Sequence, residues 1–298
     1  VDWKEAVDTC NYQNTNISIR ASNDFMKTVI NDGEWQTTPV LCQDMADEMP
    51  KYRAKELLKK ISEGTHFCGD PGMQFDDTIN KWHTCPNSGR INASNPCSEY
   101  VFLDNSSCNL ASLNLMKFLN EDGSFNVEDF SNAIRTTAIA QDLEIDNSSY
   151  PTKEIAENSH NFRPLGMGYA NLGSLLMILG LPYDSDEGRA VAASVSAIIT
   201  GKVYETSTEM AEKIGAFKEF EKNKYPMLNV IKMHRGALNE ISEEKLPKEF
   251  YNVLKEARKT WDVVVERGEK FGFRNAQASV LAPTGTIGFM MDCDTKGI

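Results

Sequence analysis

The sequence has no long run of uncharged apolar residues, and it is short of positive charge. No stretch approaches the roughly 18 such residues that a membrane-spanning helix requires, so we expect no membrane segment. Lysine and arginine number 31 against 43 acidic residues, which gives a net charge of -12. Because affinity for a phosphate backbone needs clustered basic residues, this balance disfavours binding of nucleic acid polymers. It leaves room for a nucleotide, since backbone N–H groups at turns can hold a small phosphate.

Several metal and cofactor signatures are also missing. The sequence has no Cys-x-x-Cys pair, and Cys85, Cys97 and Cys108 lie 12 and 11 residues apart, a poor spacing for a compact zinc site. A Gly-x-x-x-x-Gly-Lys phosphate loop is absent, and Gly166-x-Gly168 lacks the rest of the dinucleotide fingerprint. We interpret those two glycines as a site of close helix packing. The four histidines match no catalytic arrangement. We therefore expect no metal site.

The cysteines are seven in number and spread along the chain. An odd count in a long chain is not a secreted disulfide framework, and no signal-peptide pattern follows Val1, so we expect a cytoplasmic protein with reduced thiols. Five cysteines are most simply structural: Cys10, Cys42, Cys68, Cys85 and Cys293. The sequence starts without Met and stops at Ile298 without any loss of pattern, so we interpret it as an internal piece of a longer protein.

Hydrophobic periodicity predicts an α/β protein. The expected strands cover residues 16–20 and 277–281. The expected helices cover residues 22–31, 53–66, 126–145, 166–179, 185–215 and 249–271. Ser22 or Asn23, Asn126 and Ser185 are suited to cap three of these helices, and the acidic and basic residues of 205–259 suit solvated helix faces. No repeat or linker divides the chain, so we predict one catalytic domain over 1–298, incomplete at both ends.

Residues 68–115 are rich in Gly, Pro, Asn and Ser and contain only short apolar runs. A loop of this length inside a domain is unusual unless it is functional. Within it, Asn95, Cys97 and Glu99 occupy alternate positions. In an extended or finger-like loop such side chains can face one cavity, where a thiol, an amide and a carboxylate can perform hydrogen and proton transfer. The alternative is a buried structural cysteine beside a turn.

Four segments in order carry a resemblance to a known family. They are GDPG at 69–72, NPCSE at 95–99 followed by SCNLASLNL at 107–115, RPLGMG at 163–168, and APTGTI at 282–287. Together they resemble the catalytic subunit of ribonucleotide reductases, in particular the adenosylcobalamin-dependent class. The resemblance implies part of a ten-stranded α/β barrel with a central finger loop at about 90–110. It also implies reduction of ribonucleotides to 2′-deoxyribonucleotides for DNA synthesis.

The resemblance assigns roles to four residues of the finger. Cys97 would carry a thiyl radical that abstracts the 3′-hydrogen of the ribose. Glu99 would accept the proton of the 3′-hydroxyl, and Asn95 would hydrogen-bond the ribose hydroxyls. Cys108 would be one of two thiols that supply electrons and end as a disulfide. Its partner in the family lies far upstream of the finger, so we expect that thiol outside this sequence.

The resemblance also implies a substrate surface made of two segments. The implied substrate-binding residues are Asn95, Pro96, Cys97, Ser98 and Glu99 together with Pro283, Thr284, Gly285, Thr286 and Ile287. In the second segment Gly285 permits close backbone approach, and the N–H groups and two hydroxyls can surround phosphate oxygens. Taken alone, without the other motifs, the second segment fits an ordinary strand-to-helix turn better.

Cofactor and partners follow from the resemblance. It implies adenosylcobalamin as the radical source, a ribonucleoside di- or triphosphate as substrate, a thioredoxin-type reductant and a homodimer of the full-length protein. The iron-dependent class, which uses a separate radical-generating subunit, is the first alternative, and segments 82–93 and 288–294 favour the cobalamin class over it. A non-catalytic scaffold is the second. Without a partner for Cys108, we expect the 298-residue piece alone to be inactive.

Overall fold

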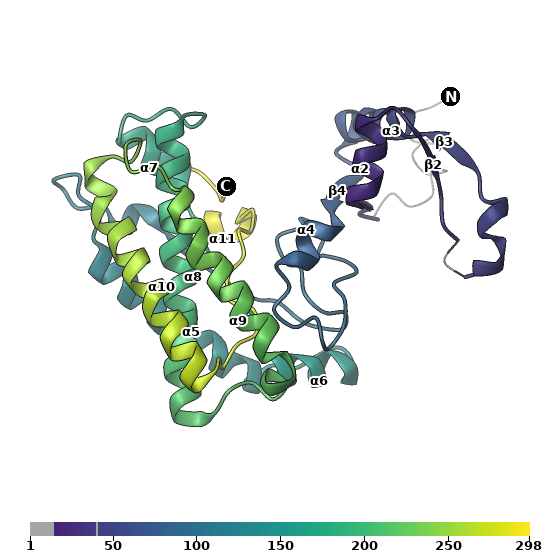
Figure 1. The fold of residues 1–298 in the computed structure, drawn as a ribbon. Helices are drawn as coiled ribbons and strands as arrows, with labels where there is room; N and C mark the ends of the chain where they lie inside the picture. The colour runs from purple at the N-terminus through teal and green to yellow at the C-terminus, as the bar shows by residue number, and fades with distance from the viewer. Residues whose placement is uncertain (1–14, 40) are drawn as a thin grey trace. The chain divides into compact units, whose positions relative to one another are not determined.

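The computed structural model describes residues 15–39 and 41–298 of the chain (Figure 1). The chain forms two compact units, Val1–Lys81 and Trp82–Ile298. Helices dominate both units, and the few strands form three two-stranded sheets. The described part is thus a mixed α/β structure, as expected. None of its helices combines the length and the apolar character that crossing a bilayer requires.

The first unit is built on a parallel pair of strands. Strand β1 (Ser18–Ala21) pairs with β4 (Gly72–Phe75), and Ser18 lies opposite Gly72. Its other elements are α2 (Asn23–Ile30), β2 (Glu34–Gln36), the 3-10 helix η1 (Gln43–Glu48), β3 (Lys51–Arg53), α3 (Ala54–Cys68) and α4 (Asp76–Lys81). Strands β2 and β3 pair antiparallel. A small core of Ala21, Phe25, Val29 and Ala54 joins the strands to the helices.

The second unit contains a parallel sheet that carries the candidate site. Strand β5 (Asn109–Asn114) pairs in parallel with β6 (Leu165–Ala170), with Asn109 opposite Leu165 and Asn114 opposite Ala170. A third segment, 277–280, runs parallel to β6 on its other edge. There Leu165 N–H donates to the Gln277 carbonyl at 2.8 Å, and Val280 N–H donates to the Met167 carbonyl at 3.0 Å. The carboxyl ends of all three segments therefore meet at one edge.

Helices surround this sheet. In chain order they are α5 (Val127–Asn147), α6 (Lys153–Phe162), α7 (Leu172–Ile178), α8 (Asp186–Ile214), α9 (Phe220–Ala237), α10 (Tyr251–Phe271) and α11 (Gly285–Met290), with the short 3-10 helices η2 (Leu115–Phe118), η3 (Leu238–Glu240) and η4 (Lys248–Phe250). The long helix α8 packs against α10 and α5 and also contacts β6 (Figure 1). Three side chains cap helices as predicted: Ser22 on α2, Asn126 on α5 and Ser185 on α8.

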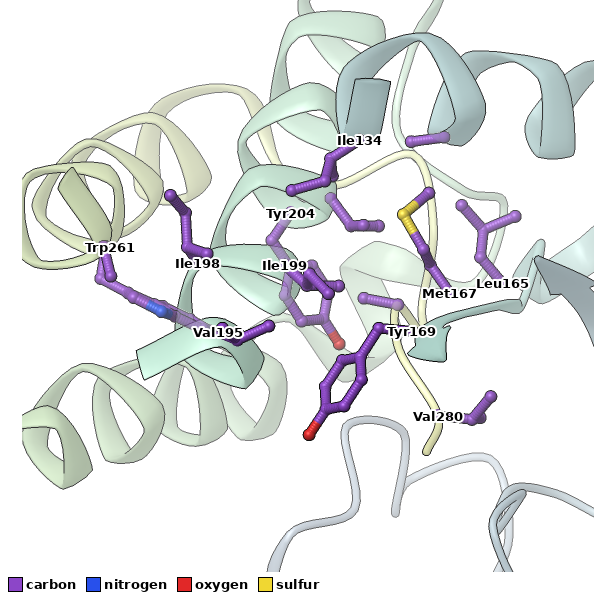
Figure 2. Close-up of a cluster of buried hydrophobic side chains, with 14 of the residues drawn as sticks. Ile134, Leu165, Met167, Tyr169, Val195, Ile198, Ile199, Tyr204, Trp261 and Val280 are labelled. Carbon is purple, nitrogen blue, oxygen red and sulfur yellow. The ribbon is translucent and has the colours of Figure 1, made fainter. Parts of the chain in front are cut away.

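The core lies between β6 and helix α8 (Figure 2). All six residues of β6 are buried, and Met167 and Tyr169 project among the side chains of α8 such as Val195 and Ile199. On the far side of α8, Trp261 of α10 donates its indole N–H to the Ala197 carbonyl at 2.9 Å. Packing on both faces of a strand restrains its backbone, and this also fixes the points where the loops at its two ends begin.

The amino-terminal end of the sheet is held by a buried ion-pair cluster. Arg163 is buried and donates to Asp142 at 2.8 Å and to Asp146 at 2.7 Å. The side chain of Asn275 donates to Asp142 and to the Arg163 carbonyl. The cluster therefore ties α5 to the residues that precede β6 and the third segment. Buried charges need such partners because an unpaired charge away from water is costly.

Two sequence-based predictions of secondary structure were wrong. Residues 166–179 are not one helix, since 165–170 form strand β6 and α7 begins only at Leu172. A fully buried parallel strand has no alternating polar positions, so its continuous apolar pattern was mistaken for a buried helix. The loop-rich region 68–115 contains β4, α4 and β5, and within it residues 69–71 and 82–108 are irregular. Helices α6 and α9 were not predicted.

Candidate functional site

The segment around Cys97 is a tight turn rather than an extended strand. Ser98 N–H donates to the Asn95 carbonyl at 3.0 Å, and Ser98 has a positive φ of 65°. The side chain of Cys97 is exposed at this turn, whereas Asn95 and Glu99 are partly buried. The alternation expected for an extended loop is therefore absent, because the turn reverses the chain between Asn95 and Glu99. The turn exposes the Cys97 thiol, and its hydrogen bond from Ser98 to Asn95 holds the backbone in place.

Tyr100 holds the base of this turn. Its N–H donates to the side-chain oxygen of Asn95 at 2.9 Å, and its carbonyl accepts from Asn95 N–H at 3.3 Å. Its hydroxyl donates to Ser106 at 3.0 Å, and Ser106 in turn donates to the Leu103 carbonyl. Burial in this setting raises the pKa of the Tyr100 hydroxyl. A neutral, buried tyrosine thus connects the turn at Cys97 with the residues just before Cys108.

Cys108 is clamped from both sides at the start of β5. The preceding Ser107 hydroxyl lies 2.7 Å from the hydroxyl of Ser159 on α6. The following Asn109 exchanges two hydrogen bonds with Gln141 of α5, at 2.7 and 2.6 Å. These bonds fix the backbone on each side of the thiol. The geometry leaves Cys108 little freedom to move along the sheet.

Gly166 makes room for the Cys108 thiol. A Cβ atom at position 166 would stand 2.6 Å from the sulfur of Cys108 and 3.2 Å from a methyl group of Val280. The neighbouring Gly168 instead allows the backbone carbonyl of Val280 to approach β6. The two glycines of the RPLGMG segment therefore serve the sheet and the thiol. The predicted role in helix packing was wrong, because residues 166 and 168 lie on a strand.

Glu99 and Cys108 form the electrostatic centre of the site. One carboxylate oxygen of Glu99 is buried and has no hydrogen-bond partner among the described residues. Burial, and then the nearby charge of Glu99, raise the pKa of the Cys108 thiol to about 12. The thiol is therefore protonated at neutral pH. A thiol that retains its proton beside an unsatisfied carboxylate is suited to donating hydrogen rather than to acting as a nucleophile.

The turn at residues 282–287 follows the third parallel segment. Thr284 has a left-handed backbone with φ 55°, is 4% exposed, and immediately precedes α11. Its hydroxyl oxygen is buried and has no hydrogen-bond partner among the described residues. A Cβ atom on Gly285 would meet nothing within 4 Å, so the backbone there borders open space. A buried hydroxyl without a partner, next to a bare backbone, is suited to holding oxygens of a ligand.

The structure brings together some of the predicted residues. Glu99 lies within electrostatic reach of Cys108, and Cys108 lies beside Val280, three residues before Pro283. Asn95 serves the turn itself through Tyr100, and Cys97 projects from that turn. Pro96, Ser98, Pro283 and Thr286 are exposed, and Ile287 is half-buried. The contacts therefore link Glu99, Cys108 and the strand that leads to the 283–287 turn, and they do not extend to the exposed thiol of Cys97.

The other cysteines differ in their surroundings. Cys85 is buried, and burial raises the pKa of its thiol to about 12. Cys42 and Cys68 are exposed, and Cys293 is half-buried. All six cysteines within the described residues are free thiols, and Cys10 lies outside those residues. In the same part of the chain, no three or more His, Cys, Asp or Glu side chains gather as a metal site would require.

Sequence reasoning missed Tyr100 and assigned Gly166 the wrong role. Tyr100 follows the five-residue NPCSE segment directly, and its alternation with Phe102 could have indicated a buried anchor. The sequence indicated only that Gly166 allows close packing. The register of β5 against β6 pairs Leu110 with Gly166, and this brings the sulfur of Cys108 next to the glycine. A contact between neighbouring strands cannot be read from one strand alone.

The second unit combines three parallel segments, a turn that exposes Cys97 before the first of them and a turn at 282–287 after the third, so the fold and the candidate site define a mixed α/β protein with free thiols. Comparison with known families gives the particular family. The model of the ribonucleotide reductase barrel domain matches residues 1–298. The chain belongs to this family. The resemblance that the segments at 69–72, 95–115, 163–168 and 282–287 carry is therefore confirmed at the level of the family.

Several relatives carry more specific names. A vitamin B12-dependent ribonucleotide reductase from Rhodopirellula baltica is 55% identical over 295 residues, which cover 99% of this chain and 28% of the relative. One of the same name from Streptomyces avermitilis is 47% identical over 294 residues, 96% of this chain and 30% of the relative. A vitamin B12-dependent ribonucleoside-diphosphate reductase from Mycobacterium tuberculosis is 34% identical over 210 residues, 70% of this chain and 30% of the relative. The chain thus spans less than a third of their length.

Proposed function

We propose that this chain is the reaction-centre portion of an adenosylcobalamin-dependent ribonucleotide reductase. The observation that carries the proposal is the buried, unpartnered carboxylate oxygen of Glu99 beside the protonated thiol of Cys108, with the exposed Cys97 two residues before Glu99. Membership of the ribonucleotide reductase barrel family supports the reaction, and the names of the relatives support the cofactor class.

In this proposal Cys97 begins and ends the reaction. Its thiyl radical removes the 3′-hydrogen of the ribose, forming an S–H bond and a carbon-centred radical. Glu99 accepts the proton of the 3′-hydroxyl, and the 2′-hydroxyl departs as water with a proton from one of the two reducing thiols. Asn95 is restrained by its bonds to Tyr100, so its amide N–H₂ group faces the ribose hydroxyls as a donor. At the end Cys97 returns its hydrogen to C3′ and is a radical again.

Cys108 supplies half of the reducing equivalents. It and a second thiol outside this chain together give two hydrogen atoms, and a disulfide forms between their sulfurs. The net reaction converts a ribonucleotide and two thiols into a deoxyribonucleotide, water and a disulfide, so atoms and electrons balance. The high pKa of the Cys108 thiol keeps the hydrogen on its sulfur until that hydrogen is transferred in the reaction. A dithiol reductant of the thioredoxin type would then restore the thiols.

The turn at 283–287 would hold the phosphates of the substrate. The buried hydroxyl of Thr284 and the open backbone at Gly285 provide donors to anionic oxygens. The chain carries a net charge of -12, so we infer that backbone groups rather than basic side chains do most of this work. A ribonucleoside di- or triphosphate fits this chemistry, and a cytoplasmic homodimer fits the family.

Cofactor chemistry enters through Cys97. Adenosylcobalamin, when bound, supplies the radical that removes a hydrogen atom from the Cys97 thiol. The exposure of Cys97 at its turn fits a radical source that approaches from outside this segment, whereas a buried thiol would not. The iron-dependent class uses the same finger logic with a separate radical subunit, and the names of the relatives favour the cobalamin class.

The test is a substitution in the full-length protein. Cys97→Ser removes the sulfur to which the proposal assigns the radical, so deoxynucleotide formation with adenosylcobalamin, dithiol and ribonucleotide should fall below detection. Cys293→Ser is the matched control, since that half-buried cysteine has no role in the proposal and activity should persist. Continued reduction by Cys97→Ser would overturn the assignment. Activity that required an added iron-containing subunit instead of adenosylcobalamin would establish the other class.

A further inference from the structure

Asn171 lies at the carboxyl end of β6, where the three parallel segments meet. It is 1% exposed, and its amide group donates to the side-chain oxygen of Asn114, the last residue of β5, at 3.0 Å. Its side-chain oxygen accepts from Thr295 N–H at 3.0 Å and from the Ser174 hydroxyl at 2.7 Å. One buried amide therefore joins the ends of two elements of the sheet to a distant part of the chain.

The segment 295–297 carries this connection to the phosphate turn. Asn171 N–H donates to the Lys296 carbonyl at 2.9 Å. Two residues from Thr295, Gly297 N–H donates to the Pro283 carbonyl at 3.2 Å. Gly297 also lies so close to the Ala282 carbonyl that a Cβ atom would collide with it. Segment 295–297 is thus hydrogen-bonded to Asn171 at one end and to Pro283, the first residue of the 283–287 turn, at the other.

The backbone of Asn171 explains the choice of residue. Its φ of 75° lies in the left-handed region, which Asn adopts more readily than other residues that carry a side chain. Glycine would suit the backbone equally but would supply no amide. Asparagine is thus the residue that combines a left-handed backbone with both a donor and an acceptor. Asn171 therefore precedes α7 with a left-handed backbone, and its side chain links β5 to segment 295–297.

We propose that Asn171 is a positioning residue for substrate phosphate, acting through 295–297 on the turn at 283–287. The inference rests on the proposed function, because it requires that turn to hold phosphate. Asn171 does not itself touch the ligand. It fixes the Pro283 carbonyl and so sets where Thr284 and Gly285 stand relative to the ends of β5 and β6.

Equilibrium binding to the full-length protein tests this proposal. Asn171→Gly keeps the left-handed backbone and removes the amide. We expect it to weaken binding of a ribonucleoside diphosphate about tenfold, and to change binding of the corresponding nucleoside less than about twofold. Asn275→Ala is the matched control, because Asn275 is equally buried and hydrogen-bonded at the opposite end of the same sheet. It should lower stability and leave the ratio of diphosphate to nucleoside affinity unchanged.

Further variants separate the inference from the proposed function. Thr284→Val removes the hydroxyl of the turn itself. If it leaves diphosphate affinity unchanged, the phosphate site is wrong and both proposals fail. If it weakens that affinity while Asn171→Gly does not, only the role of Asn171 fails. Should Asn171→Gly not fold, Thr295→Val removes the hydroxyl that bonds Asn171 and Ser174, and it should weaken diphosphate binding selectively. Equal losses for diphosphate and nucleoside would overturn the inference.

Discussion

At the scale of single residues, the site depends on contacts across strands. Cys108 has its place because nearby Gly166, which pairs with Leu110, has no side chain to collide with the sulfur, and Glu99 keeps a buried oxygen without a hydrogen-bond partner. The candidate residues were named from the sequence through the resemblance that their motifs carry, and their roles stay predictions. The roles of Tyr100 and Gly166 could not be predicted, since they arise only from the shape of the turn and the register of the sheet.

The fit between Gly166 and Cys108 can be measured as a coupling energy. Gly166→Ala should destabilise the full-length protein by about 1–3 kcal/mol, because the added methyl group overpacks against the sulfur. In a Cys108→Ala background the same change should cost at least about 0.5 kcal/mol less. Thermal unfolding of the four proteins gives both values. Gly168→Ala is the control, since it meets the Val280 carbonyl and its cost should be the same in both backgrounds.

The protonation of Cys108 makes a second prediction at this scale. Burial and Glu99 raise its pKa to about 12, so the folded state favours the protonated thiol. This contribution to stability is present below the unfolded thiol pKa of about 8.5 and is lost as pH rises above it. Alkylation of Cys108, followed by mass spectrometry, should rise with pH without a plateau near pH 9. Glu99→Gln should move the curve to lower pH, and an unchanged curve would remove Glu99 from the cause.

At the scale of elements, burial decides what the sequence can reveal. Amphipathic helices with a capping residue, such as α5 and α8, were predicted with their starts at Asn126 and Ser185. Strand β6 was mistaken for a helix because both of its faces are buried. The third segment, 277–280, was predicted as a strand, and its hydrogen bonds to β6 support that. Capping residues helped to identify α5 and α8, whereas α6 and α9 were not predicted, and the apolar pattern misled at β6, where both faces are buried.

The ion-pair cluster at the amino-terminal end of β6 gives a prediction for this element. Arg163→Met leaves the carboxylate of Asp142 buried without its main partner, which should cost about 3–5 kcal/mol. Hydrogen–deuterium exchange in the amides of β6 should speed up accordingly. Arg189→Met is the control, because Arg189 pairs with Asp184 and Asp186 on the surface and should cost no more than about 1 kcal/mol. Equal protection of β6 in both variants would contradict the proposed anchoring.

At the scale of the whole molecule, the proposed mechanism places a radical cysteine and one reducing thiol in this chain, and the partner of that thiol outside it. The chain spans less than a third of the relatives from Rhodopirellula baltica and Streptomyces avermitilis, and the six cysteines within the described residues are free thiols. We therefore predict that the 298-residue chain alone forms no deoxynucleotide with adenosylcobalamin and dithiol. Chromatography of the nucleotides after incubation measures this. Measurable turnover would show that a reducing partner for Cys108 lies within this chain.

The central claim is that Cys97 starts the chemistry as a radical and that Cys108 supplies hydrogen for the reduction. A single-turnover experiment on the full-length, pre-reduced protein tests this most directly, with ribonucleotide and deoxynucleotide counted in wild type, Cys97→Ser and Cys108→Ser. We predict that Cys97→Ser binds the ribonucleotide and leaves it intact, and that Cys108→Ser consumes it without forming deoxynucleotide. Consumption of the ribonucleotide by Cys97→Ser at the wild-type rate would contradict the account.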